Sequence, residues 1–596
     1  MINWVPPGLI FIFGTILIPL LKGRLRQAYI LLLPVLAFLN LLNMQEGISY
    51  KLNFLGRELI LVRVDSLSMV FGYVFVIVAL IGFIYSLHLQ KYGEHIAASM
   101  YVGSSLGAIF AGDFIALFIF WEIIALSSTY LIWARRTSLS ENAGFRYLLV
   151  HIFGGLCLLM GIIINFSETG STAFNLIELS GLASYLILIG FILNAAVPPF
   201  SAWLSDAYPE ATVTGAVFLS AFTTKTAVYV LIRAFPGTEL LIWLGAIMAF
   251  YGVVFAFLAN DIRRILAYHM VSQVGYMVTG IGLGTELALN GAAAHAFNNI
   301  LYKGLLFMGT GAVIQMTGKR KLSELGGLHK TMPITMILYM IGGFSIAAFP
   351  LFSGFLSKSM VVTAAADEHL TVVWLLLTIS SAGTFLSTGL KLPYFTWFSK
   401  DSGIRVKEPP LNMLIAMGIA SLLCILIGVY PEILYNILPY PVDYIPYTPE
   451  HIVWTLQILL FTALGFFVLL KHLGGEPYIT LDTDWFYRKG SLVFMRVVNN
   501  HASRVGTMIT RTTFDTIPSS LSRFSKNPLA FLKITVDRVI MSFSGFIRRE
   551  EIRGQITREK EIYPGDIIRH WPIGSTVLWV ILFLLAYLIL YYAYNI

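Results

Sequence analysis

Long apolar stretches recur along almost the whole chain and are separated by short polar segments. An apolar stretch of roughly 20 residues is long enough for an α-helix to cross a bilayer. By this measure the sequence predicts about 16 membrane-spanning helices. They lie near residues 7–21, 27–43, 66–88, 97–111, 114–133, 144–166, 180–204, 211–234, 239–258, 262–284, 287–316, 331–366, 371–398, 410–430, 451–471 and 575–595. The predicted fold class is an all-α polytopic membrane protein.

Two of the predicted helices contain similar sequences that proline interrupts. Residues 194–207 read NAAVPPFSAWLSDA and residues 346–359 read IAAFPLFSGFLSKS, with seven of fourteen positions identical and no gap. A proline removes a backbone donor and clashes with the preceding turn, so Pro198, Pro199 and Pro350 predict two broken helices. Broken helices that occur twice indicate a transport path between two structural repeats.

Two regions outside the spans have patterns of their own. Residues 45–65 alternate apolar and polar positions and predict a β-hairpin on the external side. Between the last two spans, a helical spacing of apolar residues predicts an amphipathic interfacial helix. Its apolar positions are Leu532, Val536, Val539, Ile540, Phe543 and Ile547, interleaved with Lys533, Arg538, Arg548 and Arg549.

Composition supports the membrane assignment. Of the 596 residues, 57% are apolar and only 12% are charged, which excludes an ordinary soluble protein. The net charge of +8 reflects basic loops that the count of spans places on one side, so nucleic acid is not an expected partner. These loops contain Lys22, Arg24, Arg26, Arg135, Arg136, Arg263, Arg264, residues 319–321, Arg405 and Lys407. The positive-inside rule makes that side cytoplasmic and puts both termini outside. The first apolar stretch is interpreted as a retained helix, because no basic stretch precedes it and no cleavage site follows it.

Cys157 and Cys424 lie inside apolar stretches and match no metal-binding spacing. The sequence therefore predicts no disulfide framework, no iron–sulfur cluster, no metal site, no cofactor and no catalytic centre in this chain.

Ionisable residues within the spans are the candidate functional residues, because a charge in the bilayer is costly. Low dielectric disfavours the charged form of lysine and of a carboxyl group, so both can exchange protons near neutral pH. The candidate proton or ion relay consists of Glu122, Lys225, Lys303, Lys358, Lys391, His151, His269 and His295. All of these except Lys303 have a structural alternative. A hydroxyl such as that of Ser127 could hold Glu122 neutral, and Lys358 could bond free carbonyls at the helix break. Lys225 and Lys391 could extend their ammonium groups to the membrane surface, and the histidines could have a packing role.

Other acidic residues, Asp65, Asp113, Asp206 and Glu210, lie near helix ends. The sequence favours capping or turn roles for them.

Several segments together identify a family resemblance. FWEIIALSS, FLSAFTTKTAVYVLIR, NDIRRILAYHMVSQVGYM, HAFNNILYKGLLFMGTGAV and FPLFSGFLSK resemble the antiporter-like subunits of respiratory complex I, of Mrp-type cation/proton antiporters and of membrane-bound hydrogenases. The resemblance covers roughly residues 60–400. It matches Glu122 to the family's essential membrane glutamate, Lys303 to its central lysine and Lys358 to its terminal lysine.

The resemblance also implies a domain organisation with two inverted five-helix repeats, each containing a broken helix. The segments are 1–96 (N-terminal helices and hairpin), 97–234 (first five-helix unit), 239–400 (second five-helix unit), 410–471 (C-terminal helices), 472–574 (lateral amphipathic arm) and 575–596 (anchoring helix).

The sequence departs from the family at Asn194, where most relatives have a lysine that pairs with the membrane glutamate. One hypothesis is that Lys225 replaces this lysine as the partner of Glu122. The alternative is that the first unit conducts differently, with a cation such as sodium near the carboxylate. Asn299 replaces the second residue of a family histidine pair that begins at His295.

The resemblance implies a proton-translocating membrane subunit, with or without exchange for sodium, of a multisubunit respiratory or hydrogenase-like complex in a prokaryotic cell membrane. Its expected partners are sister antiporter-like and small membrane subunits, a peripheral redox module on the cytoplasmic side, and lipid. The alternatives are a subunit of a redox-independent Mrp-type Na⁺/H⁺ antiporter, the membrane subunit of a CO₂/bicarbonate uptake complex, and a structural scaffold.

Overall fold

The computed structural model describes residues 4–54, 57–470, 485, 489–490, 492–496, 498–499, 506, 508, 510–543, 545–563 and 573–594. The chain divides into two compact units, Met1–Trp485 and Phe486–Ile596, which are called the bundle and the C-terminal unit below.

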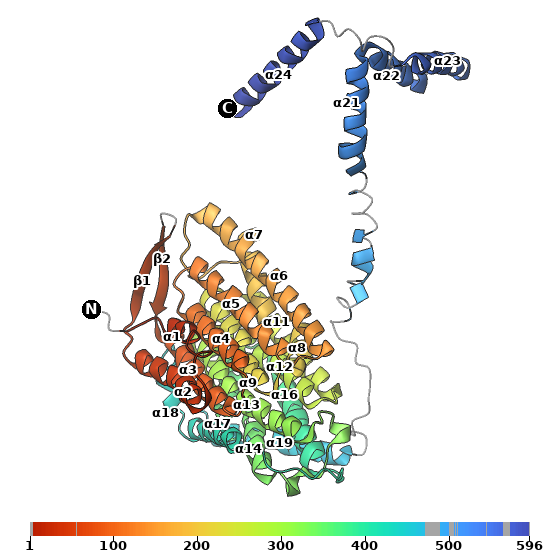
Figure 1. The fold of residues 1–596 in the computed structure, drawn as a ribbon. Helices are drawn as coiled ribbons and strands as arrows, with labels where there is room; N and C mark the ends of the chain where they lie inside the picture. The colour runs from red at the N-terminus through yellow and green to blue at the C-terminus, as the bar shows by residue number, and fades with distance from the viewer. Residues whose placement is uncertain are drawn as a thin grey trace. The chain divides into compact units, whose positions relative to one another are not determined.

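The bundle is built almost entirely of helices that run side by side (Figure 1). Its α-helices before the first break are α1 (Pro7–Gly14), α2 (Gly23–Leu42), α3 (Ser66–Ser86), α4 (Tyr92–Phe110), α5 (Phe114–Trp133), α6 (Ser138–Thr169) and α7 (Leu182–Asn194). The following ones are α8 (Ala202–Ala207), α9 (Val213–Ala221), α10 (Thr223–Ala234), α11 (Glu239–Leu258), α12 (Ile262–Leu283), α13 (Glu286–Thr317), α14 (Pro333–Ile346) and α15 (Ser353–Asp367). The last are α16 (Thr371–Thr384), α17 (Leu411–Val429), α18 (Glu432–Tyr435) and α19 (Pro449–Val468).

Short 3₁₀ and π-helical segments complete the bundle. They are η1 (Tyr208–Glu210), η2 (Leu322–Glu324), η3 (Leu328–Lys330), η4 (Phe385–Lys391) and η5 (Tyr394–Phe398). The two π-helical segments η4 and η5 continue α16, so the predicted span 371–398 is helical but changes its hydrogen-bond pattern after Thr384.

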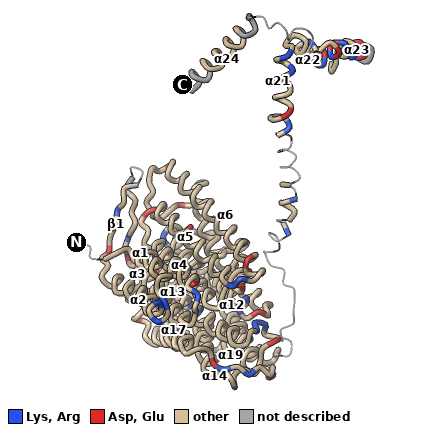
Figure 2. The backbone as a smooth tube through the Cα atoms, viewed as in Figure 1, with Lys and Arg blue, Asp and Glu red and all other residues tan. Residues whose placement is uncertain are grey.

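The predicted all-α polytopic membrane fold is confirmed. Among the described residues, ten helices are long and apolar enough to cross a membrane, and four shorter apolar helices accompany them. Figure 2 shows that charged residues are sparse along the bundle helices. The count of 16 spans and the inverted relation of two five-helix repeats stay predictions.

The predicted hairpin is present beside the helices of the bundle (Figure 1). β1 (Gly47–Phe54) and β2 (Arg57–Val64) are antiparallel, with Gly47 paired to Val64 and Phe54 to Arg57. Val62 and Val64 are buried against the helices, which explains the alternation of apolar and polar positions in this stretch.

Both predicted helix breaks are present. The first separates α7 from α8 and contains Pro198 and Pro199, and the second separates α14 from α15 and contains Pro350. At each break one alanine has left-handed backbone, Ala196 with φ 59° and Ala348 with φ 60°. A residue with a Cβ rarely adopts this conformation. The two breaks therefore share an unusual local backbone as well as a sequence.

The eighth predicted span is present as Val213–Ala234, but the prediction of one continuous helix is wrong. The span consists of two helices, α9 and α10, that meet at Phe222. The Thr223 N–H donates to the hydroxyl oxygen of Tyr101 at 2.9 Å. The ammonium of Lys225 donates to the carbonyl of Ser220 at 3.0 Å. These side chains satisfy backbone groups at the interruption, and Lys225 consequently lies just after a helix break and not in the middle of a helix.

The capping prediction holds for two of the four acidic residues. Asp65 caps α3 and Asp113 caps α5, each accepting a backbone N–H three residues later, at 3.0 Å and 2.7 Å. The prediction is wrong for Asp206 and Glu210, which form ion pairs with arginines of neighbouring segments. An ion pair with arginine is stronger than a hydrogen bond from a backbone N–H, because the arginine donor is itself charged. Asp206 and Glu210 therefore bind the arginines within their reach and do not cap a helix.

The C-terminal unit contains η7 (Arg511–Thr516), α21 (Ile517–Lys526), α22 (Pro528–Phe543), α23 (Phe546–Ile562) and α24 (Ile573–Tyr594). The predicted amphipathic helix is α22, but it ends at Phe543, so Ile547, Arg548 and Arg549 belong to α23. Leu532, Val536 and Val539 are each more than half exposed, as a helix with an unburied apolar face requires. The predicted roles of this segment as lateral arm and of α24 as membrane anchor stay predictions.

Candidate functional site

In the first half of the bundle, residues 97–234, the candidate residues Glu122 and His151 meet at one face of α6. Tyr147, His151 and Gly155 are spaced four residues apart, so they lie one above another on the helix. Glu122 extends from α5 to this face, and a Cβ added to Gly155 would lie 1.9 Å from Glu122 Oε1. The missing side chain at Gly155 thus makes room for the carboxyl group. The structure brings Glu122 to within one helical turn of His151 along α6.

The buried imidazole of His151 is held in one tautomer. Its Nδ1 lies 2.9 Å from the carbonyl oxygen of Tyr147, which can only accept, so Nδ1 carries the proton of the neutral ring. The ring packs against Tyr147 at 4.0 Å and Trp203 at 4.6 Å between centroids. Nε2 is buried without a hydrogen-bond partner among the described residues. It is therefore a free proton acceptor beside Glu122.

Lys225 is fully buried but does not pair with Glu122. Within the described part of the chain, no ion pair involves either side chain, and the Lys225 ammonium donates to the Ser220 carbonyl. Lys225 interacts electrostatically with Lys303 and His295. These interactions connect Lys225 with the second half of the bundle, residues 239–400, and its role as the partner of Glu122 stays a prediction. The amide oxygen of Asn194 is buried and has no hydrogen-bond partner in the described residues.

Two buried lysines occupy the second half. Lys303, on α13, is fully buried and donates to the carbonyl of Leu266 on α12 at 3.1 Å. Lys358, on α15, is 2% exposed and donates to the carbonyl of Ile346 at the second helix break, at 2.7 Å. Lys303 interacts electrostatically with Lys225 and Lys358. Lys303 is therefore within electrostatic range of one ammonium group from α10 and one from α15.

A row of buried polar groups crosses the second half from α15 to α16. His295 Nδ1 lies 3.0 Å from the Ser357 hydroxyl, and His295 Nε2 lies 3.4 Å from the Tyr302 hydroxyl. The Tyr302 hydroxyl donates to Gln273 Oε1 at 3.4 Å, and the Gln273 amide donates to Thr384 Oγ1 at 3.4 Å. His295 and Tyr302 of this row belong to α13, the helix that also carries Lys303.

His269 and Lys391 lie on the far side of the same half. His269 Nε2 contacts the hydroxyl of Ser387 in η4. Lys391, one turn further along η4, donates to the carbonyls of Phe257 and Ala259 at the end of α11. Lys391 is 5% exposed, so its ammonium lies among backbone carbonyls and not in solvent.

The sequence reasoning missed the neutral members of this site: Ser357, Tyr302, Gln273, Thr384 and Ser387. One signal could have identified Gln273, because it lies four residues after His269 and therefore on the same face of α12. The hydroxyl residues carry no such signal, since serine and threonine in membrane helices commonly bond to their own backbone.

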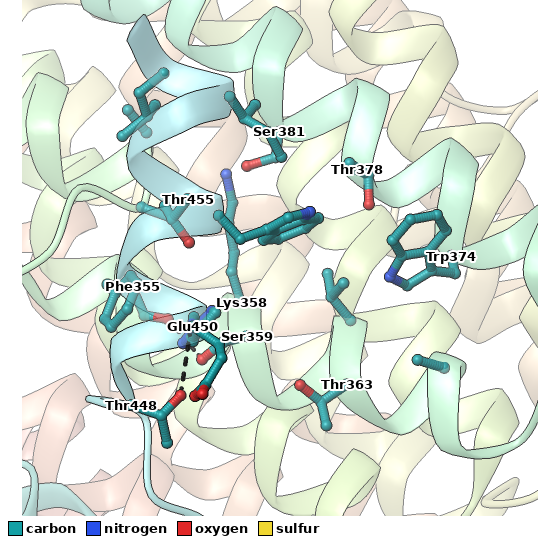
Figure 3. Close-up of a pocket in the computed structure, with 18 residues that line it drawn as sticks. Phe355, Lys358, Ser359, Thr363, Trp374, Thr378, Ser381, Thr448, Glu450 and Thr455 are labelled. Carbon is teal, nitrogen blue, oxygen red and sulfur yellow. Dashed lines mark hydrogen bonds between the residues drawn. The ribbon is translucent and has the colours of Figure 1, made fainter.

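A cavity of about 430 Å³ adjoins Lys358 and is bounded by α15, α16, α19 and the second helix break. Figure 3 shows Lys358, Ser359 and Glu450 around one part of it, and Trp374 and Thr378 around another. A cavity of this size with several polar groups can hold water. It gives Lys358 an adjoining space that can hold water.

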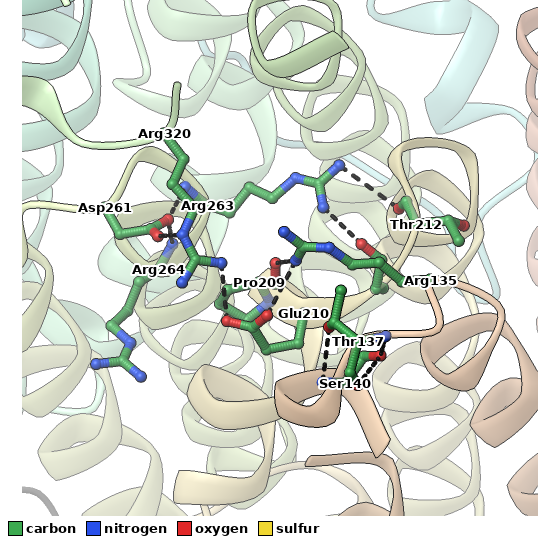
Figure 4. A network of polar contacts seen from close by, with 11 residues as sticks. Arg135, Thr137, Ser140, Pro209, Glu210, Thr212, Asp261, Arg263, Arg264 and Arg320 are labelled. Carbon is green, nitrogen blue, oxygen red and sulfur yellow. Dashed lines mark hydrogen bonds and ion pairs between the residues drawn. The ribbon is translucent and has the colours of Figure 1, made fainter. Parts of the chain in front are cut away.

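Ion pairs connect the two halves at one end of the bundle (Figure 4). Glu210 accepts from Arg135 at 3.0 Å and from Arg320 at 2.8 Å, and Arg320 also pairs with Asp261 at 2.9 Å. Buried Arg263 donates to the carbonyl of Ala211 at 2.8 Å. These contacts hold the segment that follows the first broken helix against the start of α12.

No group of three or more histidine, cysteine, aspartate or glutamate side chains among the described residues could hold a metal ion. The expectation that the chain has no cofactor stays a prediction.

Comparison with known proteins finds a family that part of the chain matches. Residues 111–387 match the family described as NADH:quinone oxidoreductase/Mrp antiporter, transmembrane. Over 427 residues the chain is 30% identical to one of the Na⁺/H⁺ antiporter proteins of Alkalihalophilus pseudofirmus, covering 63% of this chain and 53% of that protein. It is 27% identical over 414 residues to a component of hydrogenase-4 from Escherichia coli, covering 61% of this chain and 62% of that protein. The matched part spans less than two thirds of either relative.

Solved structures share the fold. The Mrp complex from Dietzia sp. contains a chain that matches with a TM-score of 0.74 and 22% identity, covering 90% of this chain and 63% of that chain. A chain of the membrane-bound sulfane sulfur reductase, an archaeal respiratory membrane complex, matches with a TM-score of 0.68 and 23% identity, covering 85% of this chain and 95% of that chain. These matches show that the chain is similar to the antiporter-like membrane subunits of complex I, Mrp antiporters and membrane-bound hydrogenases.

Proposed function

We propose that the chain translocates protons, with or without exchange for a cation, as one membrane subunit of a multisubunit complex. The observation that carries the proposal is the group of three buried lysines, Lys225, Lys303 and Lys358, which form no ion pair among the described residues and of which Lys303 interacts with the other two. Burial of three unpaired positive charges is very unfavourable. The lysines avoid this cost when they release their protons. A group that can release a proton and take one up again is what a relay requires.

The neighbouring groups give this relay its continuity. Ser357, His295 and Tyr302 can each donate and accept a proton, so a proton can be passed along this part of the row, and Gln273 holds the Tyr302 hydroxyl in place. The cavity beside Lys358 supplies space for water at one end. In the first half, Glu122 and His151 form the corresponding acid and acceptor.

The partners proposed for the chain are sister antiporter-like subunits, small membrane subunits and a peripheral redox module on the cytoplasmic side. The names of the relatives support an assembly, since one is a subunit of an antiporter and another a component of a hydrogenase. The proposed location is a prokaryotic cell membrane, with both termini outside.

A redox-independent Na⁺/H⁺ antiporter is the second candidate, favoured by the name of the relative from Alkalihalophilus pseudofirmus. Purification of the native complex through an affinity tag on this chain, followed by identification of its soluble subunits, separates the two. A redox-active subunit supports the first candidate. An assembly of membrane subunits alone supports the second, and a bound soluble zinc protein would instead indicate inorganic-carbon uptake.

Transport itself is tested with the purified complex in liposomes that contain a pH-sensitive dye. We expect an imposed pH gradient to decay faster than in protein-free liposomes, and the sodium dependence of the decay to report cation exchange. Decay at the rate of protein-free liposomes under every ionic condition would contradict the proposed function and favour a scaffold.

A further inference from the structure

The net positive charge of the chain lies in the C-terminal unit, Phe486–Ile596. This unit contains 15 lysine and arginine residues and seven aspartate and glutamate residues, a net charge of +8 that equals the net charge of the whole chain. The bundle therefore has as many acidic as basic residues, so the expectation that its loops account for the net charge is wrong. Figure 2 shows charged residues close together along α23. The excess of basic residues favours an anionic partner for this unit.

Within the C-terminal unit, α22 and α23 form a helical hairpin. Ile552 and Ile556 of α23 are buried, at 7% and 6% exposure. Arg549, near the start of α23, donates to two backbone carbonyls in the last turn of α22, at 3.1 Å and 3.2 Å. Lys533 of α22 forms an ion pair with Glu559 of α23. One face of α22 is thus occupied by its contacts with α23.

The opposite face of α22 carries a row of exposed apolar side chains, called the α22 stripe below. A rotation of about 100° per residue places this row across the helix from Ile534 and Met541, which are partly buried. The residues of the α22 stripe are between 42% and 88% exposed and comprise Leu529, Leu532, Val536, Val539, Ile540 and Phe543. None of these side chains can form a hydrogen bond. An exposed apolar row of this kind marks a surface that another molecule covers.

The beginning of α22 lies beside the apolar helix α24. The Phe524 ring, near the end of α21, lies 5.7 Å from the Phe531 ring and 5.9 Å from the Trp579 ring, between centroids. Trp579 is in the second turn of α24, which is apolar from Val577 to Leu588. Tryptophan is enriched at the membrane–water interface. These ring contacts therefore bring α21 and α22 to the level at which the predicted anchoring helix enters the bilayer.

The predicted topology puts this surface on the cytoplasmic side, because α24 would cross the membrane to a C-terminus outside. Anionic lipids of the cytoplasmic leaflet attract basic segments that lie next to a membrane helix. Arg523 and Lys526 in the last turn of α21 and exposed Arg538 on α22 are basic residues of this kind. A helix with an apolar face and basic residues around it binds such a surface by inserting the apolar face below the headgroups.

We propose that the C-terminal unit binds anionic phospholipid at the cytoplasmic membrane surface through α22. The α22 stripe lies between acyl chains, and the basic residues of α21 and α22 lie against the phosphate groups. Acyl chains match a face without hydrogen-bonding groups, and the anionic headgroups match the charge of +8. The proposed binding does not depend on ion transport.

The test uses the native complex in lipid nanodiscs, with a fluorophore whose emission reports local polarity. The label is attached to Val536→Cys in the α22 stripe, in a chain whose native cysteines are changed by Cys157→Ala and Cys424→Ala. In nanodiscs that contain phosphatidylglycerol, we expect emission at a shorter wavelength and quenching by nitroxide groups on the acyl chains. In nanodiscs of phosphatidylcholine alone, we expect the emission of a label in water. Thr557→Cys, an exposed position on α23, is the matched control and should report water in both lipids.

The charge dependence is tested with the same label at Val536→Cys. Lys526→Glu combined with Arg538→Glu should return the emission in phosphatidylglycerol nanodiscs to that in phosphatidylcholine. Lys319→Glu combined with Lys321→Glu makes the same change of net charge at exposed lysines of the bundle, and it should leave the emission unchanged. A salt concentration of about 1 M, at which the Debye length is about 3 Å, should act like the first double variant.

Three results would overturn the proposal. Emission of a label in water in both kinds of nanodisc would show that the α22 stripe does not enter the bilayer. Emission at a shorter wavelength without nitroxide quenching would show that protein covers the stripe. Equal quenching in the two lipids would show binding without selectivity for anionic phospholipid. If Lys526→Glu with Arg538→Glu does not assemble, the salt dependence of the labelled Val536→Cys chain decides, and emission unchanged at about 1 M salt overturns the proposal.

Discussion

The break between α7 and α8 and the break between α14 and α15 follow the same backbone course with different chemistry. Ala196 and Ala348 have φ values of 59° and 60°. At the second break, Lys358 donates its ammonium to the free carbonyl of Ile346. At the position equivalent to Lys358, the first half has Asp206. Its carboxylate accepts from two guanidinium nitrogens of Arg146, Nε at 2.6 Å and Nη2 at 2.9 Å.

The difference shows that a helix break positions a charge but does not decide its role. A lysine on a backbone carbonyl keeps the freedom to release its proton, since the carbonyl contributes no full negative charge. A carboxylate in a bidentate pair with arginine is held in one position by two charge-assisted hydrogen bonds. The second half therefore has a lysine at its break, whereas the first half has an ion pair there and carries its candidate relay groups, Glu122 and His151, on α5 and α6.

The largest expected effect follows from Lys303→Ala. Lys303 interacts electrostatically with both Lys225 and Lys358, so its removal takes from the proposed relay the group that connects the other two. We expect proton flux in liposomes to fall about 100-fold, as for loss of a proton-transfer group. The control is Lys319→Ala, because Lys319 is exposed. Equal flux in the two variants would remove Lys303 from the path.

A smaller effect is expected from Gly155→Ala in the first half. The new Cβ would lie 1.9 Å from Glu122 Oε1, so the carboxyl group must move away from the α6 face. Misplacing a reacting group in this way should reduce flux about tenfold. The adjacent Gly154→Ala is the matched control, since its Cβ would meet only the Leu193 side chain, at 3.1 Å. If the two alanine variants transport equally well, the position of Glu122 against α6 does not matter for transport.

The smallest effect on transport is expected from Arg146→Ala, which tests whether the ion pair at the first break is structural. The substitution leaves Asp206, 6% exposed, without its bidentate partner. Since Arg146 is 29% exposed and solvent screens part of the interaction, we expect a destabilisation of about 2 kcal/mol. It should appear as a lower melting temperature of the solubilised complex, with flux per assembled complex almost unchanged. Arg136→Ala, at an exposed arginine, is the control. A loss of flux at unchanged melting temperature would make the pair part of the transport path.

Much of the fold could be predicted from the sequence because membrane helices are recognisable by their length and apolar composition. The two ends of α5 and of α11 agree with the predicted bounds, and the hairpin and both helix breaks lie where their patterns indicated. The interruption at Phe222 could not be predicted, since no proline or glycine marks it. It depends on the Tyr101 hydroxyl, which comes from a helix more than a hundred residues earlier.

The candidate site was predictable only in its charged members. Burial confirms that Lys225, Lys303 and Lys358 lie inside the protein, but their contacts depend on how the helices pack. A sequence cannot show that Gly155 makes room for Glu122, or that the Lys225 ammonium donates to the Ser220 carbonyl at a helix interruption. The arginines that reach Asp206 and Glu210 from other segments could not be foreseen for the same reason, so a local rule predicted caps where tertiary contacts formed ion pairs.

Flux through the native complex in liposomes, compared among wild type, Glu122→Gln and Lys358→Ala at equal incorporation, tests the central claim most directly. The claim is that both halves carry protons although only one has a lysine at its helix break. It predicts that each substitution alone reduces flux to near the level of protein-free liposomes. Wild-type flux in either variant would contradict it, because the corresponding half would then have no part in transport.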